Sequence, residues 1–267
     1  SAAETEYKEA EAAAHYQLGR VYTALGNYPD SVKHLKAALP IYETLDDKES
    51  QMNALSLLGM NLAYLGNSSD ALKNTFAALE ISEKNGYDTF TAKLLNNLGN
   101  LYYSKDDFES AKTYYLRSIP LKEKLNDIKG LGAAYTNLAT TELMLKNVDI
   151  AFDYVLQSIE IKKKYTDTVK DEASLAFAKN ILGSIKRLQK NYSDALKIYS
   201  EVLDIYLRQS NMLMLCETYA LIAATYIDMG DKKSALKAIN AAEEFTAKIN
   251  AVRITEEFIR LKNLASE

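Results

Sequence analysis

The chain has 267 residues, of which 48% are hydrophobic and 25% are charged, fractions that are typical of a folded globular protein. Its formal net charge of −4 is spread along the sequence without a basic patch, which makes nucleic acid a poor candidate for a partner. Cys216 is the sole cysteine, so an internal disulfide is excluded, and no run of 18 apolar residues is present to span a membrane.

Helical hairpins are predicted from the N-terminus onward. Amphipathic stretches of about 18 residues, with apolar residues at i, i+3, i+4 and i+7, follow one another along the chain. In each pair they are joined by a short polar turn: Gly26-Asn27, Gly66-Asn67, Asp106-Asp107, Lys146-Asn147, Lys190-Asn191 and Gly230-Asp231. Gly or Asn suits the left-handed conformation that ends a helix, and Ser, Asp or Asn caps the next helix. We therefore expect six hairpins, at about 12–51, 52–91, 92–131, 132–175, 176–215 and 216–255.

Three series of residues repeat with the same period. The first is Leu18-Gly19, Leu58-Gly59, Leu98-Gly99, Leu138-Ala139, Leu182-Gly183 and Ile222-Ala223. The second is Ser31, Ala71, Ala111, Ala151, Ala195 and Ala235, and the third is Ala38, Ala78, Ser118, Ser158, Val202 and Ala242. All three advance by 40, 40, 40, 44 and 40 residues. Small side chains at these places allow two helices to approach to about 8 Å, so we expect each hairpin to cross there.

A last amphipathic segment, 252–264, follows the sixth hairpin and carries Ile254, Phe258, Leu261 and Leu264 on one side. A repeat array needs its last hydrophobic face covered. The segment is therefore either a cap or the first helix of a truncated seventh hairpin. The fold class predicted for the chain is all-α, a solenoid of six hairpins plus a C-terminal helix, forming a single domain over 1–267.

The spacing of these residues resembles the tetratricopeptide repeat, which has a small residue, an aromatic residue and two further small residues at fixed places. The third hairpin shows this order as Gly99, Tyr102, Ala111 and Ser118. With the other hairpins included, the resemblance covers roughly residues 12–255. The period departs from the usual 34 residues, which points to the subfamily with longer helices. The segment Tyr114-Tyr115-Leu116-Arg117-Ser118-Ile119 resembles blocks of Bacteroidetes-like two-component sensor kinases and regulators.

The pattern is irregular in two kinds of place. Pro40 and Pro120 lie at the same position of two second helices, and we expect each to kink its helix or end it early. The longer step between hairpins four and five lies near 166–172. In these same two hairpins, Glu142 and Lys186 replace the aromatic or aliphatic residue that the other hairpins have at the same repeat position. One hypothesis is that these two charges pair across the joint. The alternative is a half-turn shift of the packing face that leaves both in water.

Chemistry for catalysis is sparse in the sequence. There are two histidines, His15 and His34, without a metal-ligand cluster, and both are expected to be structural. Cys216 is expected to be packed rather than reactive. Gly-rich phosphate loops and nucleophile motifs are missing. We therefore predict a protein that is not an enzyme, with no catalytic or metal-binding residues and no cofactor.

The resemblance implies that the first helix of each hairpin lines a concave groove. The candidate groove residues that follow from it are Tyr16, Arg20, Asn53, Met60, Lys93, Asn96, Asn100, Tyr103, Thr136, Thr140, Asn180, Ser184 and Arg187. Amide and hydroxyl groups both donate and accept hydrogen bonds, so such a groove can bind an extended peptide backbone. The alternative is a solvated face whose partner docks elsewhere, on the convex side.

The expected partner is accordingly a protein or an extended peptide, with neither nucleic acid nor membrane contacted by this segment. Three roles compete: a sensory or regulatory segment of a larger bacterial signalling protein, a stand-alone intracellular peptide receptor, and a multiprotein scaffold. The chain begins at Ser1, which suits a processed protein or a piece of a longer one. The compartment is open between the cytoplasm and, for a sensor-kinase segment, the periplasm, and the oligomeric state is open as well.

Overall fold

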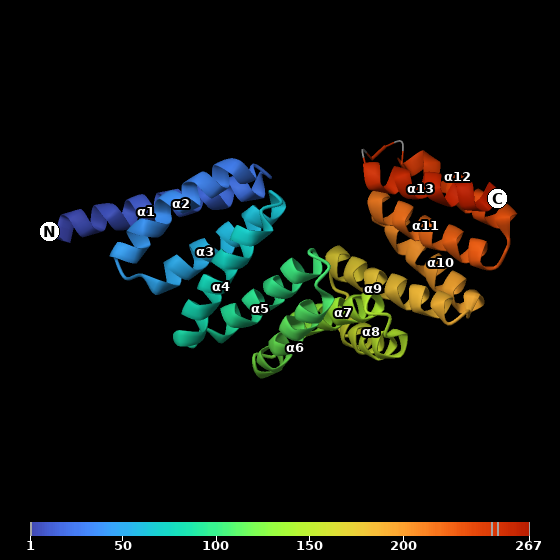
Figure 1. The fold of residues 1–267 in the computed structure, drawn as a ribbon, viewed down its shortest axis with the longest axis horizontal. Helices are drawn as coiled ribbons and strands as arrows, with labels where there is room; N and C mark the ends of the chain where they lie inside the picture. Colours follow the sequence, from blue (N-terminus) through green and yellow to red (C-terminus); the bar gives the residue numbers. More distant parts are fainter. Residues whose placement is uncertain (1, 247, 250, 267) are drawn as a thin grey trace. The chain divides into compact units, whose positions relative to one another are not determined.

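A computed structural model describes residues 2–246, 248–249 and 251–266. Within these residues the chain forms thirteen α-helices and no strand (Figure 1). The helices are α1 (Ala2–Ala24), α2 (Tyr28–Thr44), α3 (Lys48–Tyr64), α4 (Ser68–Lys84), α5 (Asp88–Tyr103), α6 (Phe108–Lys124), α7 (Ile128–Met144), α8 (Val148–Lys163), α9 (Val169–Leu188), α10 (Tyr192–Arg208), α11 (Met212–Asp228), α12 (Lys232–Thr246) and α13 (Val252–Ser266). The predicted fold, six helical hairpins and a C-terminal helix, is confirmed.

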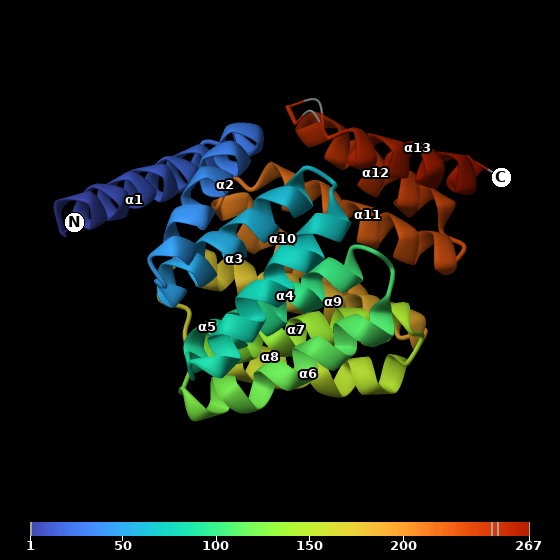
Figure 2. The ribbon, with the colours of Figure 1, turned by 60° about the vertical axis from the view of Figure 1, so that its left-hand side comes forward.

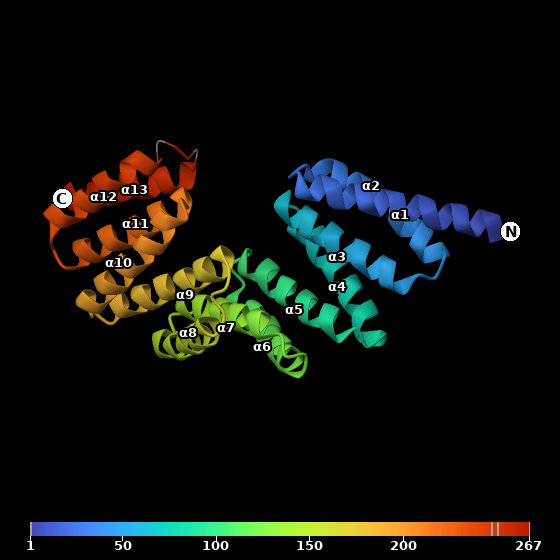
Figure 3. The same cartoon turned by 180° about the vertical axis from the view of Figure 1, so that it is seen from behind.

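The chain divides into two compact units, residues 1–130 and residues 131–267. In the first unit α1 pairs with α2, α3 with α4 and α5 with α6, and each hairpin stacks on the next (Figures 1 and 3). In the second unit α9 pairs with α10 and α11 with α12, and α13 packs on α11 and α12 (Figure 2). That the whole chain forms one domain stays a prediction.

The repeated small residues lie where the helices of each hairpin meet. All twelve residues of the second and third series are fully buried, with 0% of each exposed. A Cβ atom added to Gly99 would lie 2.4 Å from the Tyr115 ring, and one added to Gly183 would lie 2.4 Å from the Tyr199 ring. Such distances are shorter than any real Cβ contact, so only glycine admits the tyrosine. The close crossing predicted from the sequence is the observed one.

The residue at the crossing is matched in size to its partner on the second helix. The partner lies sixteen positions later in every hairpin: Gly19 with Leu35, Gly59 with Thr75, Gly99 with Tyr115, Ala139 with Val155, Gly183 with Tyr199 and Ala223 with Ile239. Both tyrosines stand opposite glycine, whereas the two alanines stand opposite β-branched aliphatic residues that share a core cluster with them. The tyrosines are thus found only opposite glycine, whereas Gly59 stands opposite the smaller Thr75.

A left-handed residue ends most of the helices at a spacing of 20 residues. Positive φ angles occur at Gly26, Asp46, Gly66, Gly86, Asp106, Asn126, Lys146, Lys190, Ser210 and Gly230. Around each one, two backbone bonds close the helix end, as where the amides of Gly26 and Asn27 donate to the carbonyls of Thr23 and Tyr22. The sequence indicated the turns inside hairpins, but three of the turns between hairpins, at Asp46, Asn126 and Ser210, have no glycine at the left-handed position, whereas the turn between α4 and α5 has Gly86.

The connection between α8 and α9 departs from the 20-residue spacing of the left-handed turns. Its extra residues replace the left-handed turn, and α9 instead begins after Thr168, which has extended backbone and accepts a hydrogen bond from the amide of Asp171 at 3.1 Å. The location of the insertion follows the sequence-based prediction. Of the described helices, none has both the length and the apolar character needed to cross a membrane.

Of the two outcomes expected at proline, the early helix end does not occur, and the kink stays a prediction. Pro40 and Pro120 lie inside α2 and α6, which continue for four more residues. In the C-terminal helix, Leu264 is 39% exposed, and Ala265 is buried in its place. Otherwise Ile254, Phe258 and Leu261 are buried as expected, and α13 covers the end of the second unit.

Glu142 and Lys186 engage different partners. The Glu142 carboxylate is fully buried and accepts a hydrogen bond from Asn147 Nδ2 at 2.7 Å. The Lys186 ammonium lies 4.5 Å from the centre of the Phe152 ring, a cation–π distance. The alternative with both charges in water is wrong for Glu142, which is fully buried, whereas the pairing of Glu142 with Lys186 stays a prediction.

Candidate binding cavities

Two of the predicted groove residues of the first unit share a cavity between α3, α4 and α5. Met60 and Asn100 line this space of about 330 Å³, here called the N-terminal cavity, together with Ala63, Tyr64, Thr75, Asn97, Leu101 and Ser104. Tyr115 holds the Asn100 amide by donating a hydrogen bond from its hydroxyl to Asn100 Oδ1 at 2.7 Å. Burial raises the pKa of Tyr115, which therefore remains a donor at neutral pH.

The other predicted residues of the first unit lie apart from this cavity. Arg20 is exposed and stacks 6.0 Å from the centre of the half-buried Tyr16 ring on α1. Lys93 is exposed, and its ammonium lies 5.5 Å from the centre of the Phe90 ring. Half-buried positions are also taken by Asn53, Asn96 and Tyr103, the last in edge contact with Phe108.

The second unit has a larger cavity of about 650 Å³, here called the C-terminal cavity. Three predicted groove residues, Thr140, Asn180 and Ser184, line it from α7 and α9. The remainder of its wall comes from Leu143, Phe177, Ile181, Met214, Glu217, Ala220, Leu221 and the α13 residues Arg253, Ile254, Glu256, Glu257 and Arg260. The first helices of hairpins four, five and six thus line one space, and the role of these residues in binding stays a prediction.

Two predicted groove residues of the second unit have other roles. Thr136 is only 3% exposed, and its hydroxyl donates to the Gly132 carbonyl and accepts from Lys162 Nζ at 2.7 Å. It belongs to the interior of the hairpin, because Lys162 reaches it from α8. Arg187 Nε lies 2.8 Å from Asp228 Oδ2. This ion pair neutralises the charge of Arg187, which was predicted to line the groove.

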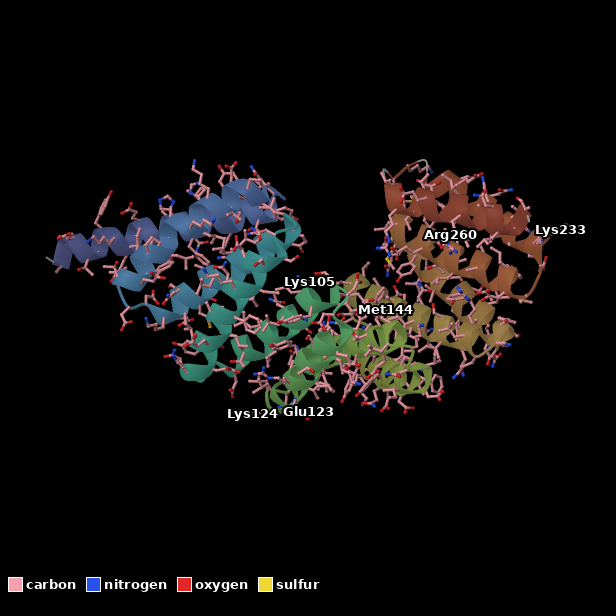
Figure 4. The ribbon with its side chains drawn as sticks, viewed as in Figure 1. Lys105, Glu123, Lys124, Met144, Lys233 and Arg260 are labelled. Carbon is pink, nitrogen blue, oxygen red and sulfur yellow. The ribbon has the colours of Figure 1, made fainter. Side chains whose placement is uncertain are left out.

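The α13 residues of the C-terminal cavity could not be found from the repeat pattern. The segment was predicted to be either a cap or the first helix of a truncated seventh hairpin, and both predictions concern its buried face alone. Arg260 lies on α13 (Figure 4) and bonds Glu257 twice, through Nε–Oε2 at 2.9 Å and Nη2–Oε1 at 2.6 Å. Phe177 and Glu217 do occupy groove positions of the repeat, so the signal for them was present in the sequence.

The two histidines meet across the first hairpin. His15 Nδ1 and His34 Nδ1 are 2.9 Å apart, and the Tyr22 ring stacks on His34. Cys216 is fully buried, and burial raises the pKa of its thiol to about 11, so the sulfur is protonated at neutral pH. Both arrangements are those of packed side chains. Among the described residues, groups of three or more His, Cys, Asp or Glu side chains suited to a metal ion are lacking.

Comparisons with solved structures show the same fold in several proteins. The apo form of RapI matches with a TM-score of 0.74 and 14% identity, over 96% of this chain and 97% of that one. The quorum sensor NprR from B. thuringiensis matches with a TM-score of 0.71 and 18% identity, over 88% of this chain and 65% of that one. A signal transduction ATPase with a tetratricopeptide repeat sensor, from Pyrococcus horikoshii, matches with a TM-score of 0.73 and 19% identity, over 97% of this chain and 39% of that one.

A search of curated proteins found no match. Family models described as tetratricopeptide repeat match residues 10–84, 90–164 and 217–248. The resemblance to repeat blocks of Bacteroidetes-like sensor kinases lies beyond these matches and stays a prediction. Arrays of this kind bind partners on the concave surface that their stacked helices form, and they are typically non-catalytic. With more than half of its residues matched and its hairpins crossing at the repeated small residues, the chain belongs to the tetratricopeptide repeat family, whose arrays are protein-binding modules.

Proposed function

We propose that this chain binds extended peptide segments of partner proteins, with the C-terminal cavity as a side-chain pocket of the second unit and the N-terminal cavity as a separate pocket of the first unit. The observation that supports this most directly is the convergence of Thr140, Asn180 and Ser184 on one cavity of about 650 Å³. A space of this size, with apolar walls and a few polar groups, suits several side chains of a peptide.

Exposed apolar groups at both cavities support the same function. Phe177 is 41% exposed at the C-terminal cavity, and Met60 and Tyr64 are 37% and 62% exposed at the N-terminal cavity. Large apolar side chains cost free energy in water, and they are typical of the central contacts of binding surfaces. A peptide that covers them gains this free energy on binding.

The test uses a phage-displayed library of random heptapeptides selected on the chain, with recovered peptides synthesised and titrated by fluorescence polarisation. Phe177→Ala should weaken binding about tenfold, because it removes an aromatic anchor. Leu213→Ala is the matched control, since Leu213 is 45% exposed on α11 but lies outside the cavity wall. Binding that is equally sensitive to both variants, or a library that yields no binder, contradicts the proposal.

The role that we propose for this binding is sensory or regulatory, within a larger bacterial signalling protein. Two structurally similar proteins are named as a quorum sensor and as an ATPase with a repeat sensor, which supports the proposal by analogy of fold alone. The complete gene tests it. A kinase domain beyond a transmembrane helix supports the role, an N-terminal helix-turn-helix favours a stand-alone peptide receptor, and a repeat array alone favours a scaffold.

A further inference from the structure

The hydroxyl groups of the C-terminal cavity have already used their hydrogen atoms. Thr140 Oγ1 donates to the backbone carbonyl of Thr136 at 3.0 Å. Ser184 Oγ donates to the backbone carbonyl of Asn180 at 3.1 Å. What Thr140 and Ser184 still offer to a ligand is their oxygen lone pairs, so both act as acceptors.

The amide of Asn180 is oriented so that it also offers an acceptor. Its Nδ2 donates to Thr218 Oγ1 at 2.9 Å, and Thr218 Oγ1 donates its own hydrogen to the Met214 carbonyl at 2.8 Å. This chain fixes which end of the amide is nitrogen. Asn180 is 5% exposed, and its Oδ1 has no hydrogen-bond partner within the described part of the chain. A buried acceptor without a donor costs about 1–3 kcal/mol, which a ligand N–H can recover.

Glu217 adds a carboxylate to the same wall. It lies on α11 next to Thr218, it is half-buried, and burial raises its pKa, an effect that Arg253 opposes. Within the described residues, its carboxylate makes neither a hydrogen bond nor an ion pair. The pocket wall formed by α7, α9 and α11 therefore carries several acceptors and one negative charge, while the hydroxyl hydrogens of Thr140 and Ser184 are bonded within the chain.

The arginines near the C-terminal cavity do not supply the donors that these acceptors and the Glu217 carboxylate lack. Arg260 is held by both oxygens of Glu257, and Arg187 on α9 is paired with Asp228. Arg253 is exposed and acts on Glu217 through space rather than by an ion pair. Beside the acceptors, Phe177 and Ile181 supply an aromatic face and an aliphatic surface, which suit the methylene stem of a long side chain.

We propose that the C-terminal cavity holds a lysine or arginine side chain of the bound peptide, with its stem against Phe177 and Ile181 and its cationic head between Glu217 and Asn180. This inference rests on the proposed peptide-binding function and adds the chemistry of the preferred residue. A cationic donor satisfies the acceptors and the carboxylate at once. An apolar or acidic side chain leaves the Asn180 oxygen unpaired, and a neutral side chain of any kind leaves the Glu217 charge uncompensated.

The test uses the peptides recovered from the library and resynthesises each cationic position as Lys, Arg, norleucine and Glu. The intact chain should bind the Lys or Arg form at least about tenfold more tightly than the norleucine form, measured by fluorescence polarisation. Glu217→Gln keeps the shape of the side chain and should reduce this preference to within about twofold, while the affinity for the norleucine form stays unchanged. Glu244→Gln, on an exposed part of α12, removes the same charge and should leave the preference intact.

The outcomes separate the two proposals. Peptides that bind through Phe177 but tolerate norleucine or Glu equally well overturn the cationic pocket and leave peptide binding standing. A preference for Lys or Arg that survives Glu217→Gln also overturns it. A library without binders refutes peptide binding itself. Equal melting temperatures of Glu217→Gln and the unchanged chain show that any loss of preference comes from the pocket and not from unfolding.

Discussion

Lys162 brings a positive charge into the interior of the second unit. It is 2% exposed, and its Nζ donates to Thr136 Oγ1 at 2.7 Å and to the Ser174 carbonyl at 3.1 Å. Burial removes the hydration of the ammonium and lowers its pKa to about 8, below the ordinary value of 10.5. Between these two values the unfolded chain binds more protons than the folded chain. The free energy of unfolding therefore rises with pH from 8 to 10.5 through this residue.

Lys162→Met should raise the free energy of unfolding at pH 7, by up to about 3 kcal/mol, and should remove this rise above pH 8. The physical reason is that methionine fills the site without a charge to desolvate. Urea unfolding at pH 7, 8, 9 and 9.5 measures both effects. The variant and the unchanged chain contain the same tyrosines, so the difference between their pH dependences reports on Lys162. Lys163→Met is the control, because Lys163 is exposed. A pH dependence identical in the Lys162→Met variant contradicts the prediction.

Lys190 closes the turn between α9 and α10 with a φ of 61°, where a side chain is strained. Lys190→Gly should increase stability by about 1 kcal/mol, since the Cβ is removed from a left-handed conformation. Lys190→Ala keeps the Cβ and should bring no gain, which separates conformational strain from the loss of the charge. The midpoint of urea unfolding measures the difference. Equal midpoints for the glycine and alanine variants are the contrary result.

At the scale of elements, the crossing of α5 and α6 depends on matched side-chain sizes. Gly99→Ala should destabilise the protein by about 1–3 kcal/mol, because its Cβ would collide with the Tyr115 ring. The double variant Gly99→Ala with Tyr115→Val should recover a large part of this loss. The reason is that the next hairpin has alanine opposite valine at the same place, as Ala139 and Val155. Tyr115→Val alone should leave a cavity and destabilise. Urea unfolding of the three variants gives the coupling, and additive effects would contradict size matching.

The elements show what the sequence could and could not predict. The repeat predicts the hairpins because the crossing of two helices needs small residues at fixed spacing. Gly99 and Ala111 are two such residues, and they can be recognised in the sequence by their period. Thr136 was misplaced because a lysine on another helix reaches its hydroxyl, a contact that no local pattern records. Arg187 was predicted to line the groove, and its charge is neutralised by Asp228 of the next hairpin. Site chemistry thus depended on contacts between elements, whereas the fold depended on periodicity within them.

At the scale of the whole molecule, the two compact units should respond separately to damage in one of them. In a repeat array each hairpin contacts its neighbours only, so stability is a sum of local terms. Native-state hydrogen exchange of Gly99→Ala should show faster exchange in α4, α5 and α6, whose helices pack on one another. Exchange in α11 and α12 of the other unit should remain as in the unchanged chain. Uniformly faster exchange would mean that the chain unfolds as a single cooperative block.

Size matching at the crossings also determines how such a chain can be rearranged. Helix α5 with its glycine accepts the tyrosine of α6, whereas α7 with Ala139 accepts the valine of α8. A recombinant that joined α7 to α6 would place alanine against tyrosine, and one that joined α5 to α8 would leave a void beside Val155. Exchange of whole hairpins preserves every match, because both partners move together. The hairpin is therefore the unit whose duplication or deletion in one piece keeps the two partners of each crossing together.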